Sequence, residues 1–243
     1  MNMYSGRAVL FDIDGTLVDT NYLHVLAWRR VFLEWGESEV ASARIHRMVG
    51  MGTDELLESL FGRPRPELKA ERARHFDALK GDIRAFPRAG DLLRALHDRG
   101  VRIVLATSAE KSDLEALLEA IDADDAIDEV TSAGEVDQAK PAPDLFCVGL
   151  EAAGTAPDAT VVVGDTVWDV EAATRAGLRC VAVTSGGISR DELEAAGAIA
   201  VFENVGAILD DLDRSPLLGG AVQSFWSSVS EGTTTVSSPR RTE

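Results

Sequence analysis

Short apolar runs alternate with amphipathic stretches along most of the chain. Five runs rich in β-branched residues have the length of buried strands, at 7–13, 101–107, 159–165, 179–184 and 198–203. Elsewhere apolar positions recur at helical spacing and predict helices at 88–99, 110–120, 142–153, 168–176, 190–196 and 204–213. Buried strands separated by helices indicate an α/β fold, in which helices cover both faces of a parallel sheet.

The alternation stops between residues 20 and 85. Four helical patterns follow one another there, at 22–35, 39–48, 53–60 and 66–80, and no strand-like run interrupts them. The sequence therefore predicts a core made of residues 1–19 and 86–214, with a helical module, 20–85, inserted after the first strand. The last segment, 215–243, is rich in Ser, Thr and Gly, which predicts a disordered tail.

Charge and composition narrow the classes of partner. The chain has 243 residues, with 24 Lys and Arg against 41 Asp and Glu, a net charge of −17. Such a charge repels polyanions, so we expect neither a nucleic-acid nor a membrane partner. No apolar run has the length of a membrane span, the N-terminus lacks a secretory signal, and both cysteines lie in apolar contexts. We expect a cytoplasmic protein, and the composition leaves its oligomeric state open.

Acidic residues stand directly after two of the predicted strands. In "VLFDIDGT", Asp12 and Asp14 are two positions apart and therefore start on the same side of the chain. In "VVVGDTVWDV", Asp165 and Asp169 lie at and beyond the end of another strand. The carboxyl ends of parallel strands meet at one edge of a sheet, where ligands bind. A lone Asp there is most simply a turn or a helix cap, whereas four carboxylates repel one another, and a hard divalent cation such as Mg²⁺ relieves that repulsion.

Two further segments offer groups that complement a phosphate. Thr107 and Ser108 end the strand pattern "IVLATS" just before a helix, where a hydroxyl and backbone N–H groups suit phosphate oxygens. The simpler alternative is a helix N-cap, and the two interpretations are compatible. Lys140 precedes Pro141 in "QAKPAPDLF", and such a lysine, taken alone, is most often on the solvated surface.

The segments "FDIDGTLVDT", "VLATS", "KPAPDLF" and "GDTVWD", in this order, resemble the four motifs of the haloacid dehalogenase superfamily of phosphohydrolases. The resemblance spans roughly residues 7–212. The helical insert resembles the α-helical cap of the phosphoglycolate phosphatase and β-phosphoglucomutase branch. Together they imply a Rossmann-like, doubly wound parallel sheet core with an inserted α-helical cap, and Mg²⁺ as the cofactor.

The resemblance also implies a role for each motif residue. Asp12 matches the nucleophile that forms an aspartyl-phosphate, and Asp14 matches the general acid and base. The implied Mg²⁺ ligands are the carboxylates of Asp12 and Asp165 and the backbone carbonyl of Asp14. Asp169 matches a position that supports the metal site without binding the metal directly. The remaining matches are implied to bind phosphate and offset its charge: Thr107, Ser108 and Lys140.

Residues of the cap are expected to face the substrate. His24 and Trp28 match positions that line the sugar side of the mutase site, although Trp28 also lies on an apolar helix face and is equally a core residue. The segment "RMVGMGTDELL" aligns with the mutase cap loop through its glycine, Gly50. Where mutases carry two cations that grip a second phosphate, this chain has Val49 and Thr53. Arg47 offers a replacement, or is simply a solvated helix residue.

These residues favour a Mg²⁺-dependent phosphatase that acts on a small phosphorylated metabolite. Asp14 argues against dehalogenation, because the dehalogenases of the superfamily lack an acid at the matching position. The first alternative is a phosphosugar mutase of the β-phosphoglucomutase type, which the missing cap cations disfavour. The second is a catalytically idle binding protein, which the complete set of motif residues disfavours. The cap loop is uncharged until Asp54, which favours a neutral leaving group over a second anion.

Overall fold

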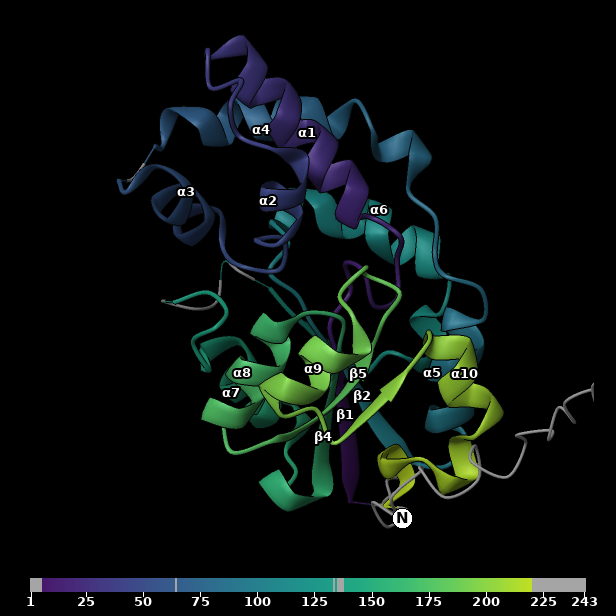
Figure 1. Ribbon diagram of the computed structural model, residues 1–243. Helices are drawn as coiled ribbons and strands as arrows, with labels where there is room; N and C mark the ends of the chain where they lie inside the picture. The colour runs from purple at the N-terminus through teal and green to yellow at the C-terminus, as the bar shows by residue number, and fades with distance from the viewer. Residues whose placement is uncertain (1–5, 64, 133, 135–137, 220–243) are drawn as a thin grey trace, which may run out of the picture.

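The core of the fold is one parallel sheet. The computed structural model describes residues 6–63, 65–132, 134 and 138–219 (Figure 1). Its strands are β1 (Arg7–Phe11), β2 (Val101–Ala106), β3 (Glu129–Thr131), β4 (Thr160–Gly164), β5 (Arg179–Val183) and β6 (Ala200–Phe202). They form a 6-stranded sheet, parallel throughout, in the order β3-β2-β1-β4-β5-β6. The predicted α/β class with a doubly wound parallel sheet is confirmed.

β1 lies in the middle of the sheet and determines which chain segments meet at its end. Its last residue, Phe11, is paired with Leu105 of β2 on one side and with Val163 of β4 on the other. The backbone N–H of Asp12 continues this ladder and donates to the carbonyl of Val163 at 2.9 Å. The strand order runs outward in both directions from β1 and β4, so the segments that leave these strands converge at the carboxyl edge, where such sheets bind ligands.

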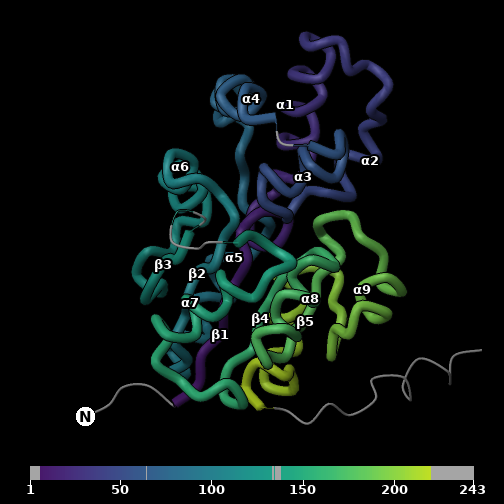
Figure 2. The backbone as a smooth tube through the Cα atoms, turned by 90° about the vertical axis from the view of Figure 1, so that its left-hand side faces the viewer, coloured from purple at the N-terminus to yellow at the C-terminus, as the bar shows by residue number. Residues whose placement is uncertain are grey.

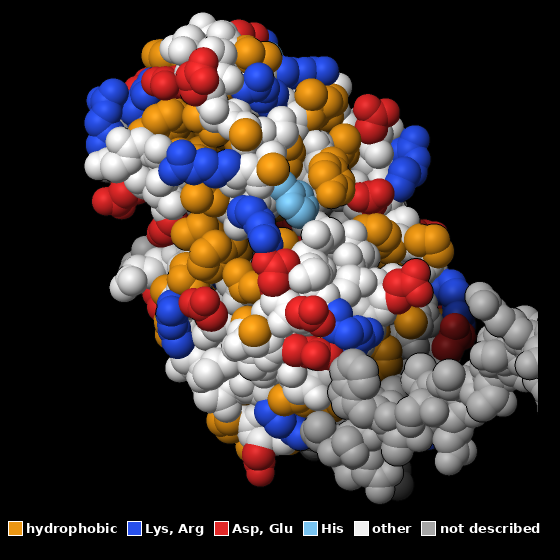
Figure 3. All heavy atoms as spheres, viewed as in Figure 1, with side chains coloured by type: hydrophobic (Ala, Val, Ile, Leu, Met, Phe, Trp, Pro, Cys, Tyr) orange, Lys and Arg blue, Asp and Glu red, His pale blue; other side chains and the backbone are white. Residues whose placement is uncertain are grey.

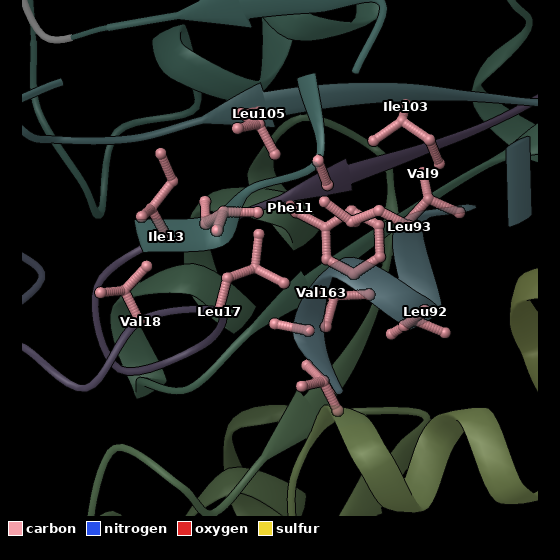
Figure 4. Close-up of a cluster of buried hydrophobic side chains, with 14 of the residues drawn as sticks. Val9, Phe11, Ile13, Leu17, Val18, Leu92, Leu93, Ile103, Leu105 and Val163 are labelled. Carbon is pink, nitrogen blue, oxygen red and sulfur yellow. The ribbon is translucent and has the colours of Figure 1, made fainter. Parts of the chain in front are cut away.

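Side chains of β1 alternate between two apolar layers. Val9 and Phe11 face the layer that contains Leu92 (Figure 4). This layer is supplied by α5 (Ala89–His97), α6 (Lys111–Ile121) and α10 (Val205–Asp210). The opposite layer, which Leu10 faces, is supplied by α7 (Asp144–Ala153), α8 (Val167–Arg175) and α9 (Arg190–Ala196). Both faces of the sheet are thereby covered, which explains the unbroken apolar runs of its strands.

Four helices follow β1 and lie together beyond the carboxyl edge of the sheet (Figures 1 and 2). They are α1 (Asn21–Glu34), α2 (Ser42–His46), α3 (Thr53–Phe61) and α4 (Glu67–Asp77). They share an apolar cluster that contains the buried side chains of Trp28, Phe32, Ile45, Leu57 and Leu68. This group of helices, called the cap below, thus has an apolar cluster separate from the two layers that cover the sheet.

The structure differs in detail from the elements that the sequence predicts. The pattern does not predict β3, because its residues, Glu129–Thr131, include a single apolar side chain and so form no apolar run. The helix predicted at 39–48 is confined to Ser42–His46. Within the segment predicted as a disordered tail, Pro216–Leu218 form a 3₁₀ turn, and Leu217 is buried against the layer that contains Val9. The rest of that segment, 220–243, lies outside the described residues.

The surface bears charges of both signs. On the face seen in Figure 3, Lys and Arg side chains are interspersed with Asp and Glu. The net charge of −17 is therefore not gathered into one acidic field on this face. Across the described part of the chain, none of the helices combines the length and the apolar character of a membrane span.

Candidate active site

Two aspartates follow β1, where the chain leaves the sheet. Asp12 directly follows the strand and is buried, whereas 14% of the Asp14 side chain is exposed. Ile13 between them points into the core and is fully buried. Gly15, at φ +78°, then turns the chain, and a Cβ at this position would lie 2.3 Å from Oδ2 of Asp165. The position therefore requires glycine, both for its dihedral angle and for the close approach of Asp165.

The end of β4 brings two more carboxyl groups to the same place. Asp165 follows the strand directly, Asp169 lies in the first turn of α8, and both are buried. Asp169 forms a capping box with Thr166, in which the backbone N–H of Asp169 donates to Thr166 Oγ1 at 3.2 Å. Ligand oxygens of Asp12, Asp165 and Asp169 lie within 4.8 Å of one another. The helix cap and the acidic cluster therefore coexist.

Lys140 places a positive charge inside this cluster. It lies in the loop before α7, and its side chain is fully buried. The ammonium donates a hydrogen bond to Asp12 Oδ1 and lies 2.7 Å from Asp169 Oδ1. Burial lowers the pKa of Lys140, but the two carboxylates raise it by more, so the ammonium stays charged. The interpretation of Lys140 as solvated surface is thus wrong, because its charge is held between two buried acids.

One ammonium does not balance the buried carboxyl groups. Burial and the neighbouring Asp169 raise the pKa of Asp12 to about 7, although Lys140 opposes the shift. Burial and the same cluster raise the pKa of Asp165 well above its usual range. The hydroxyl of Thr16 lies 3.4 Å from Asp12 Oδ2 and 3.2 Å from Asp165 Oδ1, and it has only one proton to donate. The cluster therefore has the surplus negative charge and the oxygen donors that a hard divalent cation requires.

Asn21, the first residue of α1, joins the cap to this cluster. Its Nδ2 donates to Asp165 Oδ2 at 2.8 Å and to the backbone carbonyl of Gly186 at 3.1 Å. The residue is 3% exposed, and its Oδ1 is buried without a hydrogen-bond partner among the described residues. Water ligands of a cation donate hydrogen bonds, so an orphaned acceptor beside three carboxylates suits a hydrated cation. The residues present therefore fit Mg²⁺.

Asp14 has a different set of partners. Thr20 Oγ1 donates to Asp14 Oδ1 at 2.5 Å, and His24 Nε2 lies 3.0 Å from the same oxygen. The guanidinium of Arg72 donates to His24 Nδ1 at 2.6 Å. Because Nδ1 is then an acceptor, the Nε2–H of the imidazole donates a hydrogen bond to Asp14 Oδ1. Burial raises the pKa of Asp14, but these partners, His24 foremost, lower it by more. The net pKa of Asp14 lies below its usual value, and the free protein holds this carboxyl group ionised.

A cavity of about 60 Å³ lies between the cap and the end of β1. Asp12 and Asp14 line it from the core, and the cap lines it with four of the predicted residues: His24, Trp28, Gly50 and Thr53. Trp28 is also buried in the apolar cluster of the cap, where its ring stacks on Phe32 with centroids 5.4 Å apart. Trp28 therefore belongs both to the apolar cluster and to the lining of the cavity.

Three other predicted residues have different surroundings. Arg47 does not line the cavity: its exposed side chain pairs with Glu192 of α9 at 2.5 Å, so in this arrangement it does not take the place of the mutase cations. Thr107 is fully buried, and its Oγ1 accepts the backbone N–H of Ala109 at 3.0 Å. This bond closes a turn before α6, whose N-cap is Glu110, so the N-cap interpretation of Thr107 is wrong. Ser108 lines the cavity, and its hydroxyl donates to a backbone carbonyl of the cap at 3.3 Å.

The structure adds residues that the sequence analysis did not single out. Thr20 and Asn21 begin the first cap helix, where the sequence indicates only a helix start. Arg72 lies in the charged run "ELKAERARHFD" and looks like its solvated neighbours. Gly186 lies in the "SGG" loop after β5, and a Cβ there would stand 1.6 Å from Asp165 Oδ2. The paired glycines were a signal of close backbone approach that the sequence did contain.

The chain has relatives among known proteins over most of its length. The model of the family described as haloacid dehalogenase-like hydrolase matches residues 9–183. A phosphoglycolate phosphatase from Rhodospirillum rubrum is 33% identical over 218 residues, which cover 84% of this chain and 90% of that protein. A hydrolase from Pseudomonas syringae shares 33% identity at a TM-score of 0.80, covering 86% of this chain and 98% of the other. A CbbY mutant from Rhodobacter sphaeroides, solved with xylulose-1,5-bisphosphate, shares 26% identity at a TM-score of 0.69, covering 83% and 96%.

Proposed function

The chain belongs to the haloacid dehalogenase-like hydrolase family and is a phosphoric monoester hydrolase, and on that premise we propose that Asp12 attacks the phosphorus of a small phosphomonoester. The observation that supports this most is the difference between the two carboxyl groups at the end of β1. Asp12 lies with Lys140 in the acidic cluster, whereas Asp14 is held by a hydroxyl and an imidazole. A nucleophile and a proton carrier need such different surroundings.

In the first step, a carboxylate oxygen of Asp12 forms a bond to phosphorus while the bond from phosphorus to the leaving oxygen breaks. The leaving oxygen takes the proton of Asp14. The pKa of Asp14 is low in the free protein, but an arriving phosphate dianion raises it, because a like charge disfavours the ionised carboxyl group. Asp14 then takes up a proton from solvent before the leaving group departs.

In the second step, water attacks phosphorus, and the bond between phosphorus and Asp12 breaks. Asp14, ionised again after giving up its proton, accepts the proton of that water. His24 orients Asp14 through their hydrogen bond. Inorganic phosphate then leaves and Asp12 is again a free carboxylate. Asp14 releases to solvent the proton that it accepted from water, because its pKa falls once the phosphate has gone, and the enzyme is back in its starting state.

Mg²⁺ is the cofactor of this proposal, held by the carboxylates of Asp12 and Asp165 and the backbone carbonyl of Asp14. When bound, it offsets negative charge on the phosphoryl oxygens. Asp169 keeps Lys140 in place at 2.7 Å, and the ammonium adds a second positive charge beside the nucleophile. Thr107 and Ser108 supply donors for the phosphate, and the cap, residues 20–85, excludes bulk water from the site.

We propose hydrolysis of the phosphomonoester rather than phosphoryl transfer between two positions of a sugar. Val49 and Thr53 line the cavity where mutases carry cations, and Arg47 is paired with Glu192 outside it. A bisphosphate intermediate would therefore lack a grip on its second phosphate. If a coupled assay detects isomerisation of a hexose phosphate that depends on a bisphosphate activator, the protein is a mutase and this proposal is contradicted.

Asp12→Asn tests the proposal, with release of inorganic phosphate measured over a panel of phosphorylated metabolites and an aryl phosphate. Loss of the nucleophile should lower kcat by at least about a thousandfold while circular dichroism shows an unchanged fold. Asp19→Asn, an exposed change of the same kind later in the same loop, should stay within about twofold of the wild type. EDTA should abolish turnover and Mg²⁺ should restore it. More than a tenth of wild-type activity in Asp12→Asn would refute the mechanism.

A further inference from the structure

The cap lines the cavity mostly with apolar side chains, those of Trp28, Val49, Met51 and Leu56. Thr53 of the cap and Ser108 of the core add hydroxyl groups, which are polar but uncharged. Of the described residues that line the cavity, Arg72 is the one with a Lys or Arg side chain. A second anionic group on a substrate, beyond the phosphate itself, would therefore depend on Arg72 for a partner of opposite charge.

The guanidinium of Arg72 is already committed to other partners. It donates to Asp113 Oδ2 at 3.2 Å and to His24 Nδ1 at 2.6 Å, and it lies over the ring of Phe76, 4.6 Å from the centroid. Its side chain is only 12% exposed. The Nε of Arg72 has no hydrogen-bond partner within the described part of the chain, but this atom is buried and so is not open to the cavity. Turning Arg72 toward a ligand would break its pair with Asp113 and withdraw its donor from His24.

Asp113 is the counter-charge that holds Arg72. It lies in the first turn of α6, it is 4% exposed, and its Oδ1 also lies 2.9 Å from Nζ of Lys80. Lys80 pairs in turn with Asp77 at 2.6 Å, so these four side chains carry two positive and two negative charges. A carboxylate as buried as that of Asp113 needs its cations, because leaving it unpaired is strongly unfavourable. The cluster therefore offers no net positive charge to a ligand.

We propose that this site selects phosphomonoesters whose leaving group is an uncharged alcohol, and that Asp113 determines this specificity by neutralising Arg72. The inference rests on the proposed phosphatase function. A carboxylate or second phosphate on the leaving group would lose its hydration without gaining a free cation. A small neutral alcohol suits both the apolar lining and a cavity of about 60 Å³.

A matched pair of substrates tests this selectivity. Phosphoglycolate carries a carboxylate, and 2-hydroxyethyl phosphate is similar in size but has a hydroxyl group in its place. We expect the wild-type kcat/KM for phosphate release with Mg²⁺ to favour 2-hydroxyethyl phosphate by at least about tenfold. A kcat/KM for phosphoglycolate that is equal or higher overturns the proposal but leaves the phosphatase function standing. No phosphate release from this pair or from the wider panel would instead contradict the function itself.

Three variants then test the role of Asp113. Asp113→Asn frees Arg72, so the ratio of kcat/KM for phosphoglycolate over 2-hydroxyethyl phosphate should rise at least about tenfold, mainly through a lower KM for phosphoglycolate. Glu115→Gln, an exposed substitution on the same helix with the same change of charge, should leave the ratio unchanged. Arg72→Gln should also keep the ratio within about twofold of the wild type, because a neutralised cation contributes little to binding an anion.

Using a ratio of two substrates cancels any effect that these variants have on the chemical step. An unchanged ratio in a folded Asp113→Asn protein overturns the role of Asp113. A tenfold fall of the ratio in Arg72→Gln overturns it as well, since it would show that Arg72 already binds the anion. Arg72→Gln also decides the matter if Asp113→Asn does not fold, because Lys80 remains as a partner of Asp113 in that variant.

Discussion

Replacing Lys140 shows how much its positive charge contributes to the folding free energy of the acidic cluster. Its side chain is fully buried and pairs with Asp12 and Asp169. Lys140→Met keeps an unbranched apolar stem but removes the charge. Removing one partner of a buried ion pair costs about 3–5 kcal/mol of folding free energy. Asp12, whose pKa is already raised to about 7, relieves part of this loss by taking up a proton, so we expect about 3 kcal/mol without Mg²⁺.

Thermal and urea unfolding followed by circular dichroism measure this loss. It corresponds to a fall in Tm of about 6–12 °C, at roughly 2–4 °C per kcal/mol for a chain of this size. The control Lys69→Met breaks a pair with Asp54 in which the side chains are 41% and 58% exposed, and it should cost less than about 1 kcal/mol. Mg²⁺ should narrow the gap between Lys140→Met and the wild type, because the cation restores positive charge to the cluster. A Tm for Lys140→Met within the range of Lys69→Met would refute this reasoning.

Two further substitutions test the surroundings of the site. Gly186→Ala places a Cβ 1.6 Å from Asp165 Oδ2, so calorimetry should show about 10–100-fold weaker Mg²⁺ binding, whereas Gly81→Ala, whose Cβ meets nothing within 4 Å, should leave it unchanged. Unaltered affinity in Gly186→Ala would contradict the packing of Asp165 against that loop. Arg47→Ala removes an exposed pair with Glu192 and should change kcat/KM by less than about fivefold for neutral and anionic substrates alike. A loss confined to bisphosphate substrates would assign Arg47 to the second phosphate.

The chemistry at the strand ends could be predicted from spacing. Asp12 and Asp14 end one apolar run and Asp165 ends another, and a parallel sheet brings such ends to one edge. Lys140 could be predicted only through the likeness of its motif to a family, because no periodic pattern marks a lysine before a proline as buried. Its burial depends on two carboxylates, one of them 128 residues away along the chain. Local sequence does not contain that information.

Arg72 and Asp113 could not be predicted for the same reason. Arg72 lies among other charged residues of α4, and no apolar periodicity marks it as the one that turns toward the core. Asp113 has the position of an acid in the first turn of a helix, which the helix dipole ordinarily explains. Their ion pair joins residues 41 positions apart, in the cap and in the core. The contacts proposed to set specificity form between elements, whereas sequence patterns describe one element at a time.

The connection from β1 to α1 links the position of the cap to the state of the carboxyl groups. Asn21 and His24 lie three residues apart on α1, and they donate to Asp165 and Asp14 respectively. Displacing α1 from the sheet breaks both contacts together, because both side chains belong to one rigid helix. Asp14 then loses the partner that contributes most to lowering its pKa, and Asp165 loses its amide donor. The position of the cap therefore determines whether both carboxyl groups keep these hydrogen bonds, and the proposed reaction depends on a docked cap.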